Sequence, residues 1–179
     1  LLNLPRLWRM RARSRRSLYL ASMPKEAAPR RGSIPYIYTM GFARKSAGQF
    51  FEALRAVGSG YLLDIRVHNT SQLAGFARKD HLVYLVPELT RLQYRHELLL
   101  APSEDLFKKW RRGLAWEQYV LQYEALLEQR KAAHRIENSV FSDGVVLLCT
   151  EPSPERCHRI LAAEFLRREF APTSTLVHL

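Results

Sequence analysis

Two kinds of pattern alternate along this chain: short runs that suit strands and longer runs with the apolar spacing of helices. The short runs predict strands over residues 36–40, 61–66, 93–97, 145–148 and 175–178. The longer runs predict a helix capped by Ser46 and further helices over residues 79–89, 103–111, 116–131 and 154–169. Strands separated by helical crossovers form right-handed βαβ units. We therefore expect a single three-layer α/β domain with a largely parallel β-sheet flanked by helices, in which the first two strands pair.

Positive charge is concentrated at the start of the chain. The formal net charge is +11, and residues 1–33 hold nine of the 28 Lys and Arg residues but one of the 17 acidic residues. This segment therefore carries +8, and the remaining residues carry only +3. We interpret residues 1–33 as a basic leader that is disordered or not part of the natural protein, and residues 34–179 as the domain. An arm that binds nucleic acid and an organelle transit peptide are the alternatives.

The cysteine content and hydropathy of the chain indicate the cellular compartment in which the protein is expected. The chain has two cysteines, no secretory signal and no apolar run long enough to span a membrane. Reduced thiols in the cytoplasm, with no membrane partner, are the expectation. The chain also lacks a Walker loop and a dinucleotide-binding glycine fingerprint, so no cofactor is predicted.

The richest concentration of reactive groups follows the predicted strand 145–148. Cys149 follows this strand and precedes a helix amino terminus, where the thiol pKa can fall, so it is a candidate nucleophile. Packing as an inert small hydrophobe is the alternative. Glu151 is a candidate for proton transfer. His158 and Arg159, early in the following helix, could hold an anion, or His158 could cap the helix while Arg159 neutralises Glu151. Cys149, Glu151, Cys157 and His158 could together supply mixed ligands to zinc. Adjacent Cys157 and His158 after a seven-residue spacer do not follow a familiar zinc spacing, so no metal is predicted.

Two charged residues end the predicted strand 61–66. Asp64 is a candidate general base, or it could hold a loop amide or Arg159. Arg66 could clamp a phosphate or carboxylate, or pair with Asp64 or Glu151. We expect both side chains to reach one pocket only if the chain turns at Arg66, and residues 69–75 provide that turn.

The loop after this strand mixes amide, hydroxyl and aromatic groups. Asn69, Ser71 and Gln72 are candidate ligand-binding residues, which with Phe76 would suit a flat heterocycle such as a nucleobase. In the alternative interpretation Asn69 or Ser71 closes a turn and Phe76 fills the core.

These segments together resemble a known family. The resemblance rests on the strand 63–66, the loop 69–76, the turn 100–102, Trp116 with Tyr119, and the segments 148–151 and 157–159. They are similar in order and spacing to the bacterial and archaeal family called domain of unknown function 488 (DUF488), over about Tyr36 to Leu179. The resemblance implies a compact α/β domain and brings no established reaction, substrate or cofactor. Many members place a histidine after the glycine of the first strand, where this chain has Phe42.

Two functions remain. The first is binding of, or catalysis on, a small anionic ligand at the carboxyl edge of the sheet, with a nucleotide-like molecule as one candidate. The second is a nucleic-acid-associated binding module without catalysis, which would use the basic leader. The first predicts that one cavity is bordered by Asp64, Arg66, Cys149, Glu151, His158 and Arg159.

Overall fold

A five-stranded sheet forms the centre of the molecule. The computed structural model describes residues 36–141 and 143–179, and the basic leader lies outside them. The strands are β1 (Tyr36–Gly41), β2 (Ser59–Asp64), β3 (Arg91–His96), β4 (Gly144–Cys149) and β5 (Thr175–His178). They lie in the order β3-β2-β4-β1-β5, and every neighbouring pair is parallel. The predicted parallel sheet is confirmed.

The predicted pairing of the first two strands is wrong, because β4 lies between them. Val145 of β4 is in register with Ile37 of β1 on one side and Tyr61 of β2 on the other. All residues of β4 after its first glycine are buried, which suits the central position of a sheet covered on both faces. The close approach of β2 to β4 requires glycine at Gly60, whose φ is +133° and where a Cβ would lie 1.8 Å from the carbonyl oxygen of Gly144.

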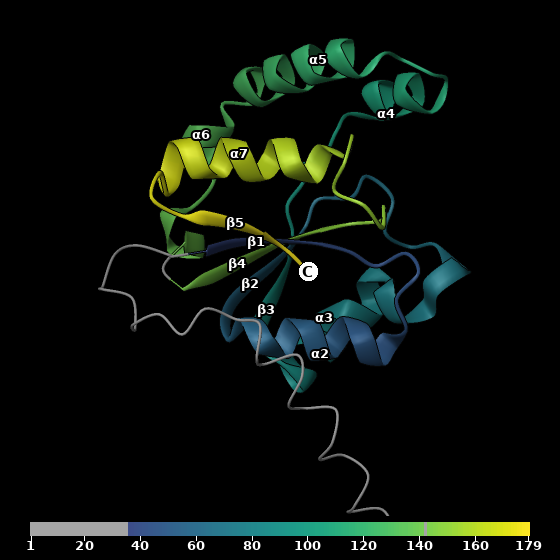
Figure 1. Cartoon of the computed structure of the whole chain (residues 1–179), viewed down its shortest axis with the longest axis vertical. Coiled ribbons are helices and arrows are strands. Elements are labelled where there is room, and N and C mark those ends of the chain that lie inside the picture. The colour runs from purple at the N-terminus through teal and green to yellow at the C-terminus, as the bar shows by residue number, and fades with distance from the viewer. Residues whose placement is uncertain (1–35, 142) are drawn as a thin grey trace, which may run out of the picture.

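Helices cover both faces of the sheet (Figure 1). Beneath the sheet in that view lie α2 (Ala47–Val57) and α3 (Lys79–Leu89), and above it α4 (Glu104–Arg111), α5 (Trp116–Gln129), α6 (Ala132–Arg135) and α7 (His158–Phe170). Short 3₁₀ turns span Gln72–Ala77 and Asn138–Phe141. Ser46 caps α2 as predicted, in a reciprocal pair of hydrogen bonds with Gln49. The three-layer α/β architecture is therefore confirmed.

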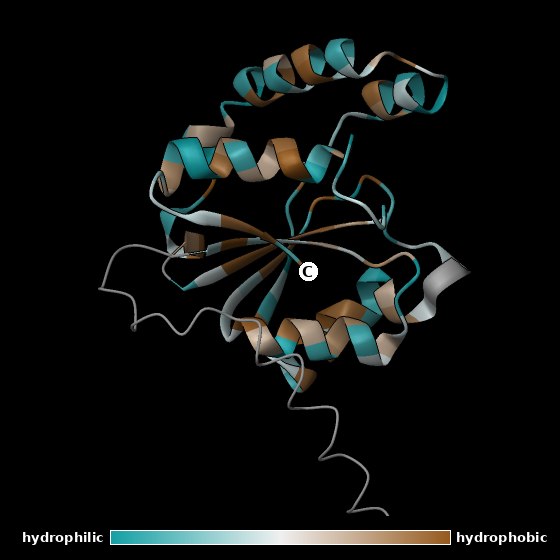
Figure 2. Cartoon of the chain, viewed as in Figure 1, coloured by the Kyte–Doolittle hydropathy of each residue, from teal (hydrophilic) through white to brown (hydrophobic). Residues whose placement is uncertain are grey.

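Each layer of helices closes its own apolar core. Figure 2 shows hydrophobic residues along the strands and on the helices that face them. One core packs α5 and α7 against the sheet and includes Tyr123, Leu147 and Leu166, and the other packs α2 and α3 and includes Phe50 and Leu82. Within the described residues, no helix is both long enough and apolar enough to cross a membrane.

Two element boundaries differ from the prediction in ways that shape the site. β2 ends at Asp64, so Ile65 and Arg66 lie beyond the regular strand. α7 begins at His158 rather than at Pro154, since residues 150–157 form an irregular loop in which Arg156 has a φ of +50°. The segments that follow β2 and β4 both leave the sheet at its carboxyl edge, where they meet.

Candidate functional site

The carboxyl ends of β1, β2 and β4 bring two distant parts of the sequence together. Cys149 is the last residue of β4, opposite Gly41 of β1. The backbone N–H of Ile65, just past β2, donates to the carbonyl oxygen of Leu148 at 3.1 Å. The loop that follows β4 returns to this edge, where Cys157 is the N-cap of α7. In parallel α/β sheets this edge is where ligands bind.

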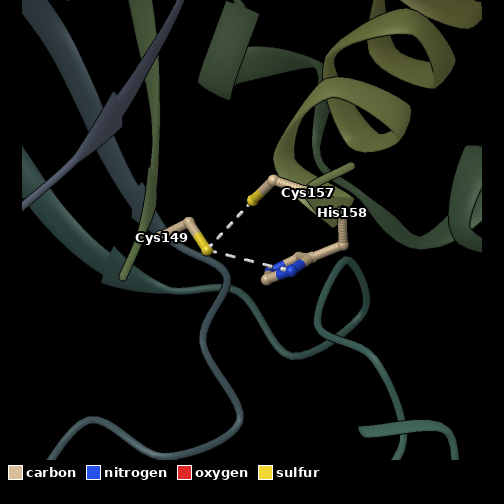
Figure 3. A group of neighbouring side chains, drawn as sticks. All are labelled: Cys149, Cys157 and His158. Atoms are coloured by element: carbon tan, nitrogen blue, oxygen red, sulfur yellow. Dashed lines mark hydrogen bonds between the residues drawn. The ribbon is translucent and has the colours of Figure 1, made fainter. Parts of the chain in front are cut away.

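Two thiols and an imidazole meet at this edge (Figure 3). The Sγ atoms of Cys149 and Cys157 are 3.3 Å apart, and the Sγ of Cys149 is 3.8 Å from the Nδ1 of His158. Both cysteines are reduced and almost fully buried, with 2% and 3% of their surface exposed. We call Cys149, Cys157 and His158 the thiol cluster. Its three sulfur and nitrogen atoms all lie within 4.8 Å of one another, close enough to hold one metal ion.

A backbone carbonyl fixes the ring of His158. Its Nε2 lies 3.1 Å from the carbonyl oxygen of Ile65. A carbonyl oxygen only accepts hydrogen bonds, so Nε2 carries a proton. In the neutral ring Nδ1 then presents its lone pair toward Cys149.

The cluster holds its two thiols in different states. The hydrogen bond from Cys157 brings the pKa of Cys149 well below its usual value, against the opposing effect of burial, and the neighbouring His158 lowers it further. The same hydrogen bond and burial raise the pKa of Cys157. Burial lowers the pKa of His158, but the negative charge of Cys149 outweighs this effect and the net shift is upward. Cys149 is therefore the thiol that ionises first.

Arg159 lies next to the cluster and has no acidic partner among the described residues. Its side chain is 1% exposed. Its Nη1 donates to the carbonyl oxygen of Glu151 and approaches the Sγ of Cys157 at 3.9 Å, and its Nη2 donates to the carbonyl oxygen of Pro152 at 3.3 Å. Its Nε is buried without a hydrogen-bond partner. Arg159 thus braces the loop after β4 through carbonyl groups, and it does not form the predicted pair with the carboxylate of Glu151.

Gly41 permits this arrangement of the loop. A Cβ at this position would lie 1.6 Å from the carbonyl oxygen of Glu151 and 2.7 Å from the Nη1 of Arg159. Only a residue without a side chain lets the loop and the guanidinium pass over the end of β1.

A second group of polar residues forms around Asp64, which is fully buried. Arg66 donates to both of its carboxylate oxygens, from Nε at 2.7 Å and from Nη2 at 2.6 Å. Tyr94 donates its hydroxyl at 2.7 Å and Asn69 its side-chain amide at 3.1 Å. Burial opposes ionisation of Asp64, but the hydrogen bonds and charge of Arg66 outweigh it and lower its pKa. We call these four residues the Asp64 network.

In the Asp64 network, Arg66 pairs with Asp64 rather than pointing a free guanidinium toward a ligand, which is the structural alternative for these two residues. The chain turns at Arg66, the condition for both side chains to meet, and the Arg66 guanidinium also donates to the carbonyl oxygen of Ala77 at 2.9 Å. Ile65 lies between the two charged residues, and its carbonyl group is the one that holds His158. The network therefore fixes the backbone that orients the imidazole of the thiol cluster.

The predicted site residues thus fall into two adjoining groups and an exposed remainder. Cys149, His158 and Arg159 come together at the end of β4 and the start of α7. Asp64, Arg66 and Asn69 belong to the Asp64 network. Of the remaining three, Ser71 and Glu151 are exposed, and the side chain of Gln72 lies outside what the structure describes.

Sequence reasoning missed two contributors. Cys157 was left out of the predicted site because its spacing from Cys149 matches no familiar zinc motif, yet its Sγ lies 3.3 Å from that of Cys149. Tyr94, on β3, gave no signal in the sequence, because its contact with Asp64 depends on the pairing of β2 with β3. Two surface hollows in the described part of the chain are lined by residues of α4, α5 and α7, and neither includes a predicted site residue.

The fold and the site define a class: a parallel α/β domain with buried thiols and an imidazole at the carboxyl edge of its sheet. Within this class, the family model for the domain of unknown function DUF488 matches residues 46–166, more than half of the chain. The chain belongs to this family, as its sequence predicts. The match is narrower than the expected range from Tyr36 to Leu179, so β1 and β5 lie outside it. No curated protein and no solved structure gave a match.

Proposed function

We propose that this domain binds and acts on a small anionic molecule at the carboxyl edge of its sheet, beside the thiol cluster. The observation that carries the proposal is Arg159, a guanidinium that is 1% exposed and has no carboxylate partner among the described residues. A buried charge is costly unless an opposite charge compensates it. Carbonyl oxygens satisfy part of its hydrogen bonding, but they carry no net charge. A bound anion would supply the missing compensation.

The position of Arg159 on α7 favours the same ligand. It is the second residue of a 13-residue helix, and the backbone N–H groups of a first helical turn attract negative charge. The unpartnered Nε of Arg159 provides an unused donor at this end of the helix. The covering residues Thr150 to Ser153 are exposed. Access to Arg159 therefore requires this loop to move.

The candidate roles of the other site residues follow from their contacts. Cys149, the thiol whose pKa is lowered, is the candidate nucleophile beside such a ligand. Glu151, exposed on the covering loop, could transfer protons once the loop closes on a ligand. Asp64 and Arg66 hold each other and serve to position the backbone. A nucleotide-like ligand would place its base toward the loop that contains Asn69 and Ser71. The reducing cytoplasm is the location that suits two free buried thiols.

A thermal-shift screen of the full chain tests the proposal. The probes are inorganic phosphate, thiosulfate, sugar phosphates and nucleotides, each compared with sodium chloride at equal ionic strength. At one hundred times its Kd a ligand stabilises the native state by about 2.7 kcal/mol, which corresponds to a rise in Tm of roughly 5 to 10 °C for a chain of this size.

Two variants make the screen specific. Arg159→Met removes the buried charge, whereas Arg167→Met removes an exposed arginine on the same helix that pairs with Glu164. We expect the stabilisation to disappear in Arg159→Met and to persist in Arg167→Met. A screen in which no anion exceeds sodium chloride would contradict the proposal.

A further inference from the structure

We propose that the thiol cluster is a metal site, in which Cys149, Cys157 and His158 bind a thiophilic divalent ion such as zinc through two sulfurs and Nδ1. The sequence offers these residues as ligands, but their spacing follows no familiar zinc motif, and the folded chain is what brings the three donors together. It stands independently of the anion proposal, because the three donors come from the protein itself. Three protein ligands leave one position of a tetrahedral ion for a ligand from outside the chain.

The distances between the donors suit a tetrahedral ion. With zinc–sulfur bonds of about 2.3 Å and zinc–nitrogen bonds of about 2.0 Å, two sulfurs lie about 3.8 Å apart and sulfur and nitrogen about 3.5 Å apart. The cluster has 3.3 Å between the sulfurs of Cys149 and Cys157 and 3.8 Å between Cys149 and the Nδ1 of His158. Side-chain rotations that shift these atoms by a few tenths of an ångström would bring the two Cys149 distances to tetrahedral spacing. The third pair, the Sγ of Cys157 and the Nδ1 of His158, lies within 4.8 Å.

The local backbone explains how two adjacent residues can both supply ligands. Cys157 has extended dihedral angles, and His158 begins the helix. In a strand these neighbours would point to opposite faces. The change from extended to helical backbone between them lets both side chains point toward Cys149, as Figure 3 shows.

The surroundings of the donors have the features of a metal site's outer shell. Imidazoles that bind metals usually donate their second N–H to a carbonyl or carboxylate group, which fixes the ring. His158 does so through Nε2 to the carbonyl oxygen of Ile65. Arg159 approaches the Sγ of Cys157 at 3.9 Å and can donate to a sulfur that carries negative charge.

Because both thiols are buried, their sulfurs are more accessible to a metal ion than to a substrate molecule. The two thiols are 2% and 3% exposed, so a substrate that reacts directly with Cys149 would have to open the site first. The two sulfurs are 3.3 Å apart and so are not joined in a disulfide, whose bond length is about 2.05 Å. An ion needs no cavity for a molecule, only convergent donors.

The charge balance connects the two proposals. Two thiolates and one divalent ion sum to zero, so the charge of Arg159 stays uncompensated when the ion is bound. An anion in the fourth position of the metal would lie close to Arg159 and neutralise it. The metal thus supplies an attachment point for the proposed ligand, while its own binding does not require that ligand.

Cobalt(II) is the probe that tests the site, because its absorption reports its ligands. The full chain is reduced, freed of metal with a chelator, loaded with cobalt(II) and desalted, and the metal content is measured by mass spectrometry. We expect one ion per chain and a sulfur-to-cobalt charge-transfer band. The chain has only these two cysteines, so such a band can come from no other thiol of the protein.

Four variants assign the ligands. Cys149→Ser, Cys157→Ser and His158→Ala are each expected to lower the affinity for cobalt at least about tenfold, whereas His134→Ala, which changes an exposed histidine on α6, keeps it. A folded His158→Ala variant that binds cobalt as tightly as the wild type overturns the proposal, as does a reduced wild-type chain that retains no cobalt.

A measurement on the wild-type chain covers the case in which the variants fail to fold. Alkylation of both thiols is followed with and without zinc in the native protein. Protection of both thiols by one equivalent of zinc supports the site, and alkylation at an unchanged rate overturns it. Anion stabilisation of the metal-free chain is measured separately, so the metal site and the anion site can fail independently.

Discussion

Neutralising Asp64 is the sharpest test of how the carboxyl edge is held together. In Asp64→Asn the carboxylate that accepts hydrogen bonds from Arg66 is lost, while the guanidinium stays 5% exposed. Removing one partner of a buried ion pair leaves an uncompensated charge and typically costs about 3 to 5 kcal/mol. That cost is a large part of the total stability of an ordinary domain, about 5 to 15 kcal/mol.

Urea denaturation measures this cost, and two variants control it. Asp80→Asn breaks an exposed pair with Arg78 and should cost at most about 1 kcal/mol. The double variant Asp64→Leu/Arg66→Met replaces both charges by apolar groups, and it should recover much of the lost free energy because the desolvation cost disappears with them.

The stability of Asp64→Asn relative to wild type should also depend on pH. The pKa of Asp64 is lowered in the folded state, so its charge stabilises the fold above its unfolded pKa of about 3.9, and this contribution disappears as the pH falls below that value through the folded pKa. The difference between wild type and Asp64→Asn should therefore be full at neutral pH and shrink below about pH 4. An Asp64→Asn variant no less stable than Asp80→Asn at pH 7 would refute the reasoning.

Four further substitutions test the packing of the domain. Gly41→Ala should cost about 1 to 3 kcal/mol in urea denaturation, since its Cβ would meet the carbonyl oxygen of Glu151 at 1.6 Å; unchanged stability would show that the loop moves freely. Gly48→Ala, inside α2 with ordinary van der Waals space around the added Cβ, should stabilise by about 0.5 to 1 kcal/mol, and a loss of Tm would contradict this. Leu147→Ala, at a fully buried position of β4, should cost about 2 to 5 kcal/mol. Leu121→Ala, at a position that is 68% exposed, should change the free energy of unfolding by no more than about 0.5 kcal/mol.

Local pattern was sufficient to locate most helices and strands, because apolar periodicity reports which residues face a core. The helix over residues 79–89 and the strand over residues 175–178 have the predicted bounds. Strand order was not predictable in the same way. The insertion of β4 between β1 and β2 joins segments about a hundred residues apart, and it depends on packing against both neighbours.

The sequence predicted the part of the site whose residues lie close together in the chain. Cys149, His158 and Arg159 were placed together because one strand end, one loop and one helix start contain them all. The partnership of Asp64 with Arg66 was predicted as one of several alternatives, since it depends on a turn that the pattern permits without requiring. Cys157 was missed because the change of backbone at a helix N-cap, rather than the spacing of residues, turns its side chain toward Cys149.

The two polar groups of the carboxyl edge are joined by a single carbonyl. Asp64 and Arg66 form an ion pair and flank Ile65 in the sequence. The carbonyl oxygen of Ile65 accepts a hydrogen bond from the Nε2 of His158. A substitution that releases Arg66 therefore loosens the backbone that sets the direction of the imidazole, although neither charged side chain contacts the thiol cluster in any described hydrogen bond. Loss of ligand or metal binding in an Asp64 variant would not by itself identify Asp64 as a group that contacts the ligand. The loss of binding has to be compared with the loss of stability in the same variant. Substitution of a positioning residue lowers both together, whereas substitution of a catalytic residue lowers function with little loss of stability.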